Sequence, residues 1–152
     1  MTSGTEANLT GSALESFVRD ALLARGYKKI EWNKFDRAVA LGEPIFSQQY
    51  RMGRSIYETP FKIDFVVFHP QKWPDCLAIE CKWQQVAGSV DEKFPYMVAN
   101  LKERSKFDFV ILLDGNGYKP GARRWLMQQQ DKKFIKLMSM SEFQTWANKK
   151  NI

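Results

Sequence analysis

The sequence has few of the side chains that usually bind zinc. It contains one histidine, His69, and two cysteines, Cys76 and Cys81. With so few ligands, a closed zinc site, a zinc deaminase centre and the histidine-rich nuclease classes are excluded. An extended chain from Cys76 to Cys81 covers roughly 16 Å, which is too far for a disulfide. We therefore expect both cysteines to be core thiols.

Long hydrophobic runs are also missing. No apolar stretch approaches the ~20 residues of a membrane span, and no basic start followed by an apolar core suggests a signal peptide. We expect a cytoplasmic protein that does not enter a membrane. The small and polar residues at 1–10 predict a flexible start. The length of 152 residues and the hydrophobic content of 44% predict a single domain at 11–152.

Hydrophobic periodicity predicts alternating helices and strands. Helices are expected at 13–25, 89–104, 122–130 and 141–148, and strands at 27–35, 63–68, 77–85, 107–113 and 134–138. The run at 107–113 is continuously apolar, as in a central strand that is buried on both faces. This order predicts an α/β fold with a mixed central sheet flanked by helices.

The stretch from Lys62 to Gln85 carries the strongest catalytic pattern, in two strands joined by a turn. Alternation along the second strand places Glu80, Lys82 and Gln84 on one face. If the hairpin folds symmetrically, Asp64 on the first strand pairs near Cys81 and lies diagonal to Glu80 and Lys82. Three charged groups then meet at one point.

Two carboxylates at this separation repel each other unless a cation lies between them, and hard divalent cations with oxygen ligands suit such a site. Mg²⁺ is the natural candidate, with Asp64 and Glu80 as its ligands. Lys82 could then position a water or stabilise charge on an attacked phosphate. The chemistry predicted is metal-assisted phosphodiester hydrolysis, with Gln84 as a candidate helper. Ca²⁺ should bind with little turnover.

A simpler interpretation is that Glu80 and Lys82 are solvated residues and that Asp64 is only a salt-bridge partner. Glu15 likewise has two interpretations. It lies at the edge of the apolar stripe of the helix at 13–25, and it could also be an N-terminal acid favoured by the helix dipole.

The formal net charge of +6 suggests a partner that carries phosphate. The polar segment at about 36–59 is predicted to be a DNA-reading insertion, because arginine and glutamine suit the edges of guanine and adenine. A solvated insertion without function is the alternative. The candidate DNA-binding residues are Gln48, Gln49, Arg51 and Arg54 as base readers, with Lys119, Arg123 and Arg124 on phosphates.

The element order, Asp64, the Glu80-Cys81-Lys82 motif and an acid in the first helix resemble the PD-(D/E)XK nuclease superfamily over about residues 11–140. The resemblance implies that Glu15, Asp64, Glu80 and Lys82 are catalytic and that Asp64, Glu80 and Glu15 bind metal. Ile63 stands where the name-giving proline would precede the aspartate. The literal Pro74-Asp75 begins the strand of Glu80 and lies too far from that residue to share its metal.

Within the superfamily, the chain resembles homing endonucleases encoded by cyanobacterial group I introns. This resemblance implies a Mg²⁺-dependent endodeoxyribonuclease that cuts both strands of a long double-stranded DNA target and so promotes intron homing. A Holliday-junction resolvase, a type II restriction endonuclease and a non-catalytic nucleic-acid-binding domain are the alternatives. One active site per chain implies at least a homodimer, and a long target favours a tetramer. Phe143 and Trp146 on the last helix are a candidate subunit contact, unless they belong to the core.

Overall fold

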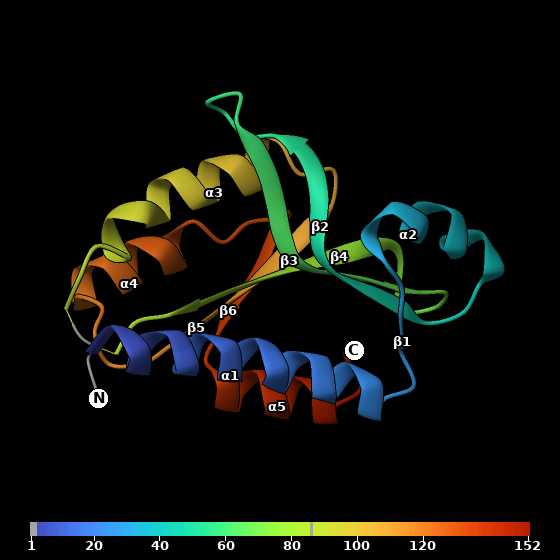
Figure 1. Cartoon of the computed structure of the whole chain (residues 1–152), viewed down its shortest axis with the longest axis horizontal. Helices are drawn as coiled ribbons and strands as arrows, with labels where there is room; N and C mark the ends of the chain where they lie inside the picture. The colour runs from blue at the N-terminus through green and yellow to red at the C-terminus, as the bar shows by residue number, and fades with distance from the viewer. Residues whose placement is uncertain (1–2, 86) are drawn as a thin grey trace.

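The computed structural model describes residues 3–85 and 87–152, with the backbone alone for residues 3–10 (Figure 1). The helices are α1 (Ser3–Ala24), α2 (Trp32–Ala38), α3 (Phe94–Glu103), α4 (Pro120–Gln128) and α5 (Met140–Asn148). The strands are β1 (Lys28–Lys29), β2 (Ile45–Arg54), β3 (Pro60–His69), β4 (Trp73–Trp83), β5 (Asp108–Asp114) and β6 (Phe134–Met138). None of the described helices is both long and apolar enough to cross a membrane.

The six strands form one sheet in the order of the chain, β1-β2-β3-β4-β5-β6. Strands β2, β3 and β4 are antiparallel, whereas β1 pairs with β2, β4 with β5, and β5 with β6 in parallel. The predicted α/β fold with a mixed central sheet is confirmed.

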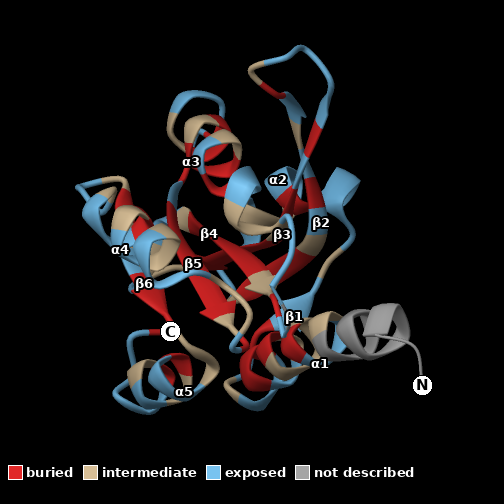
Figure 2. Cartoon of the chain, turned by 90° about the vertical axis from the view of Figure 1, so that its left-hand side faces the viewer, coloured by how far each residue is buried: buried red, intermediate tan, exposed pale blue. Residues whose placement is uncertain are grey.

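Helices cover both faces of the sheet. In Figure 1, α1 and α5 lie side by side below the sheet, and α3 and α4 lie above it; Figure 2 shows the buried strands between the two layers. Strand β5 is covered on both faces, which explains why the run at 107–113 is continuously apolar. Its Ile111 packs in the core under α3 and α4, while its neighbours Val110 and Leu112 pack in the core under α1 and α5.

The structure bears on the predictions for the two cysteines and for the last helix. Cys76 and Cys81 form no disulfide. Phe143 is fully buried and meets Phe17 of α1 edge-to-face at 6.1 Å, and the ring of Trp146 packs near Trp73. Phe143 is therefore core and does not contact a second subunit, whereas Trp146 is partly exposed and a subunit contact through it stays a prediction.

Three segments differ from the predictions. The first helix was expected at 13–25, but α1 begins at Ser3, so the interpretation of Glu15 as an acid at the start of the helix is wrong. The strand expected at 27–35 is only the two residues of β1, because α2 begins at Trp32 and turns Phe35 inward against Tyr50. The segment at 36–59 holds the end of α2 and the whole of β2. Its outer half is exposed, because it extends past the rest of the sheet, and this exposure explains its polar composition. The flexible start expected at 1–10 concerns residues 1 and 2, which lie outside the described chain, and the first turns of α1.

The hairpin register is one residue away from the symmetric prediction. Phe65 pairs with Ile79, and the same register continued brings Asp64 opposite Glu80 rather than Cys81. The cause is an irregularity near the turn, where the pairing shifts between Val67 and His69 and Cys76 takes a left-handed φ of 69°.

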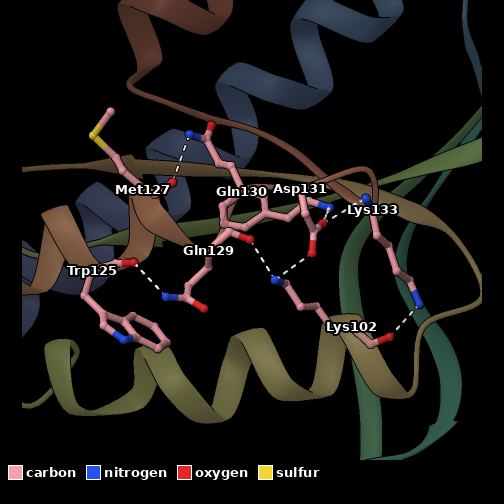
Figure 3. A network of polar contacts seen from close by, with 8 residues as sticks. Lys102, Trp125, Met127, Gln129, Gln130, Asp131 and Lys133 are labelled. Carbon is pink, nitrogen blue, oxygen red and sulfur yellow. Dashed lines mark hydrogen bonds and ion pairs between the residues drawn. The ribbon is translucent and has the colours of Figure 1, made fainter.

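Polar contacts fix α3 relative to the segment between α4 and β6 (Figure 3). Lys102 Nζ lies 2.8 Å from Asp131 Oδ2 and donates to the carbonyl of Gln129 at 2.7 Å. Lys133 Nζ donates to the carbonyl of Lys102 at 2.7 Å. These contacts hold the C-terminal end of α3 in place.

Asp131 gives a prediction for the pH dependence of stability. The ammonium of Lys102 and the backbone N–H groups of Phe134 and Lys133 lower the pKa of the Asp131 carboxyl from 3.8 to about 2. Because the folded-state pKa is the lower one, the carboxylate stabilises the fold above about pH 4 and loses this effect as the pH falls to about 2. We expect Asp131→Asn to cost at most about 1 kcal/mol near neutral pH, because the pair is partly exposed. Urea unfolding of both proteins at pH 7 and pH 2 measures this, and an equal difference at both pH values would contradict it.

Candidate active site

The candidate site lies at a fork between β3 and β4. The two strands pair beside each other at Phe65, Val66 and Val67, but residues 60–63 of β3 pair only with β2. Beyond the fork, residues 80–83 of β4 pair with β5. Figure 1 shows the β2–β3 hairpin bending away from the sheet here. The fork leaves room for polar side chains that a continuous sheet would exclude.

Asp64 stands at the branch point. Its Oδ2 accepts a 2.8 Å hydrogen bond from the backbone N–H of Cys81. Its Oδ1 accepts from Nε2 of Gln49 on β2 at 3.3 Å, and the same Nε2 donates to Oε1 of Glu15 on α1 at 3.4 Å. The carboxyl groups of Glu15 and Glu80 lie close enough to Asp64 to shift its pKa. Three acids from α1, β3 and β4 therefore meet.

Glu80 and Lys82 lie on the face of β4 that is turned toward α3, as alternation predicts. The apolar row is on the opposite face, where Cys81 and Trp83 pack under α1 and α5. Lys82 Nζ lies 3.3 Å from Oε1 of Glu80, which is only 5% exposed. This ion pair does not balance the site, because it sets one ammonium against three carboxyl groups.

The pKa values follow from this crowding. Burial, and then the charge of Asp64, raise the pKa of Glu80 well above its usual range and also raise the pKa of Glu15. Burial acts to raise the pKa of Asp64 too, but the pKa is lowered by Glu80, by the charge of Lys82 and by the hydrogen bond from the Cys81 N–H. The pKa of Lys82 is raised by Glu80 and Asp64 although burial opposes this. The cluster therefore holds Lys82 as a cation and disfavours full ionisation of the acids.

The donor set fits a hard divalent cation in type and charge. Glu15, Asp64 and Glu80 offer carboxylate oxygens, and a cation between them would relieve their repulsion. As arranged, no group of three or more His, Cys, Asp and Glu side chains within the described residues forms a ready metal site. The carboxyl groups instead contact each other, Gln49 and Lys82, so they would have to turn to bind a metal.

Gln84 does not extend the row of Glu80 and Lys82. Strand β4 ends at Trp83, so the alternation stops there. The Oε1 of Gln84 accepts from the N–H of Val90 at 3.0 Å, and its Nε2 donates to the carbonyl of Gly117 at 2.7 Å. These bonds tie together the loops on either side of α3 and β5, which is a structural role; a catalytic role of Gln84 stays a prediction.

The predicted base readers lie on the exposed half of β2. Gln48 and Gln49 help to line a surface hollow beside the acids. Its other residues are Arg19, Lys29, Ile30, Glu31, Trp32 and Asn33. The guanidinium of Arg51 lies 4.5 Å from the ring centre of Trp32, and Arg54 donates to a carbonyl of the hairpin tip. Of these residues, the structure brings Gln49 into contact with the acids.

The predicted phosphate contacts lie elsewhere, at the start of α4. Lys119 and Arg124 are exposed, and the backbone N–H of Lys119 donates to Asp91 at 3.0 Å. Arg123 contacts Met127 one turn along the helix. The sequence reasoning missed a different basic group, Lys62 and Lys93, which lines a pocket beside Glu80. The position of Lys62, two residues before Asp64 on the same strand, was the available signal.

A mixed α/β sheet with an acid–lysine cluster at the fork of two strands defines a class of nuclease domains. A family model described as the PD-(D/E)XK nuclease superfamily domain matches residues 6–151. The chain belongs to this superfamily and carries a nuclease domain. No curated protein sequence and no solved structure matched the chain.

Replacing the central acids should separate activity from stability. We expect Asp64→Asn and Glu80→Gln each to lower nuclease activity at least about 100-fold, because each removes a charge that transition-state stabilisation needs. The raised pKa of Glu80 means that its protonated form stabilises the fold below about pH 4.5, and this contribution is lost as the pH rises through the folded-state pKa. Glu80→Gln should therefore raise the melting temperature near neutral pH.

Cleavage assays and thermal melts of the same preparations test both statements. Glu103→Gln, on the exposed end of α3, is the matched control and should change neither quantity. Full activity in Asp64→Asn would refute the assignment of the site. A lower melting temperature in Glu80→Gln would refute the account of its pKa.

Proposed function

We propose that the protein is a Mg²⁺-dependent endodeoxyribonuclease that hydrolyses phosphodiester bonds in double-stranded DNA. The observation that carries the proposal is the meeting of Glu15, Asp64 and Glu80 beside Lys82, with more negative than positive charge. Membership of the nuclease superfamily supports the reaction class. A domain that only binds nucleic acid would not need three crowded acids that oppose one another.

In this proposal Asp64 and Glu80 hold the metal, and Glu15 completes the site through a water or a second metal. Bound Mg²⁺ supplies Lewis-acid polarisation of the phosphate and a water of lowered pKa. Asp64 is fixed for this task by the Cys81 N–H. Lys82 remains charged, and its ammonium can donate to the attacking water or to a phosphate oxygen as negative charge develops.

For the biological role we propose site-specific cleavage of a long target, as in intron homing. The support is the resemblance of the sequence to intron-encoded homing endonucleases. Holliday-junction resolvases and type II restriction enzymes would use the same four residues. Incubation with plasmid, a long-target library and a four-way junction, each with Mg²⁺ or EDTA, tells these activities apart.

The need to cut both DNA strands determines the number of subunits that we propose. The described side chains of each chain form one such cluster of acids beside a lysine, so two strands cut in step require two chains related by a two-fold axis. A homodimer is the minimum, and a tetramer suits a target longer than ~20 base pairs, since one domain of this size covers about 12. Light scattering of the protein on DNA tests this, and a monomer that makes double-strand breaks in one encounter would overturn it.

Glu15 and Lys82 are predicted to act on the rate rather than on the fold. We expect Glu15→Gln and Lys82→Ala to lower the single-turnover rate at least about 100-fold while DNA binding in EDTA is retained, because both groups act on the reacting phosphate or its water. Because α1 begins at Ser3, Glu15 lies inside the helix and is not a helix-start charge. If Glu15 has only a structural role, its replacement should change the thermal stability and leave the rate unchanged. Comparing the rate with the thermal shift decides between the two roles. Ca²⁺ in place of Mg²⁺ should support binding with little cleavage.

A further inference from the structure

A second basic site lies beside the acids, between the β2–β3 hairpin and α3. We call it the lysine groove, and its volume is about 250 Å³. It is lined by Ser55, Pro60, Phe61, Lys62, Glu80, Lys82, Lys93, Tyr96, Met97 and Asn100. Glu80 and Lys82 belong to the candidate active site, so the groove opens directly onto it.

Specific contacts hold the two walls of the groove together. The Oδ1 of Asn100 on α3 accepts from the backbone N–H of Ile56 in the hairpin tip at 2.8 Å. The ring of Tyr57 in the same tip stacks on Tyr96 of α3, with the centroids 4.9 Å apart. Asn100 is only 4% exposed. The spacing of the walls is therefore set by the fold and does not depend on a mobile side chain.

The charge of the groove differs from that of the acid cluster next to it. Lys62, Lys82 and Lys93 contribute three ammonium groups against the single carboxyl of Glu80. Lys82 is paired with Glu80, whereas Lys62 and Lys93 form no ion pair with any described residue. Two free ammonium groups that converge beside a hydrolytic site can receive a phosphate.

We propose that the lysine groove binds a backbone phosphate that neighbours the cleaved one on the same DNA strand, with Lys62 and Lys93 as its ligands. The inference rests on the proposed nuclease function, and it places part of the DNA backbone on one side of the acids. On the other side of the acids, Gln49 leads into the hollow that contains Arg19 and Lys29. The cleaved strand would thus cross the acids from the lysine groove to this hollow.

The test combines a double variant with DNA that carries a neutral methylphosphonate at single positions. A duplex that the wild type binds in EDTA is made with the substitution at each phosphate in turn, and any cleavage point is mapped on the same duplex with Mg²⁺. In wild type, one position next to the cut should weaken binding in EDTA. In Lys62→Ala/Lys93→Ala the same substitution should cost nothing further, and the slope of log Kd against log salt should fall by about one.

Lys136→Ala/Lys149→Ala is the matched control, because it removes two lysines from a hollow beside α5 on the other face of the sheet. It should keep the wild-type response to every methylphosphonate. The groove assignment is overturned if the Lys62/Lys93 variant responds as the control does. If the wild type binds the duplex through this position but cleaves no DNA with Mg²⁺, the proposed function fails and the groove stands.

A second inference concerns Gln49 and rests on a different observation, the unusual backbone conformation of this residue. Gln49 has a backbone φ of 52°, which residues other than glycine rarely adopt within a strand. At the same level β3 changes face, since Ile63 packs under α3 while Phe65, two residues later, packs under α1. The distortion turns the amide of Gln49 to Glu15 and Asp64. Backbone strain tends to persist at functional sites. Because the strained residue Gln49 contacts two acids, we expect its side chain to have a role there.

We infer that Gln49 is a positioning residue, which holds Glu15 against Asp64 through one amide group, and that it is not a base reader. Gln49→Gly tests the side chain alone, because glycine accepts the left-handed φ. We expect the single-turnover rate to fall about 10–100-fold, as for other residues that orient acidic ligands. DNA affinity in EDTA and the preference for each base pair should not change. Gln49→Ala should show the same rate loss and also melt at a lower temperature.

Gln49→Asn provides the conservative comparison, since asparagine tolerates this φ but its amide is one methylene shorter. We expect it to restore part of the rate by reaching one of the two acids. If Gln49→Gly cleaves at the wild-type rate, the positioning role is wrong. If it relaxes the preference at one base pair instead, Gln49 reads bases as the sequence first suggested.

Discussion

The divergence of β3 from β4 at Asp64 is the constraint on which the site depends. A paired strand at this point would place backbone, not open space, beside Glu80. Because β3 leaves with β2, Glu80 can face α3 while Asp64 stays in reach of the Cys81 N–H. The same departure creates the outer half of the hairpin, whose tip then binds α3 through Asn100. One change of partner thus produces both the acid cluster and the groove next to it.

The acids meet at a cost to stability that the rest of the domain must offset. Burial and mutual repulsion raise the pKa of Glu80 and Glu15, so their ionised forms oppose folding near neutral pH. Extensive packing on both sheet faces holds them in place. Phe143 of α5 packs on Phe17, two residues from Glu15 in α1, so the position of this acid depends on the last helix as well as on its own. Function and fold are coupled through the layer of α1 and α5.

Periodicity was enough to predict the parts of the structure whose environment is uniform. The apolar run of β5 and the alternation around Glu80 and Lys82 depend on local geometry, and both predictions hold. Two features could not be predicted, because they depend on distant partners. Gln84 has the right spacing for the polar row, but its strand has already ended and its amide binds neighbouring loops. The φ of Gln49 has no signature in sequence, since glycine is absent there and the acids that its amide contacts come from other elements.

Charge in this domain is separated over short distances, and the separation suits a polyanionic substrate. A uniformly basic surface would bind DNA without directing any phosphate to the acids, and the acids alone would repel it. Here the acid cluster adjoins the lysine groove through Glu80, and it adjoins the hollow that contains Arg19, Lys29 and Glu31 through the contacts of Gln49. A strand held at both basic sites would be drawn across the carboxylates, and a bound cation would then remove the remaining repulsion. The net charge of +6 reports only the sum of these opposed regions, so it is their arrangement that could direct one phosphate to the acids.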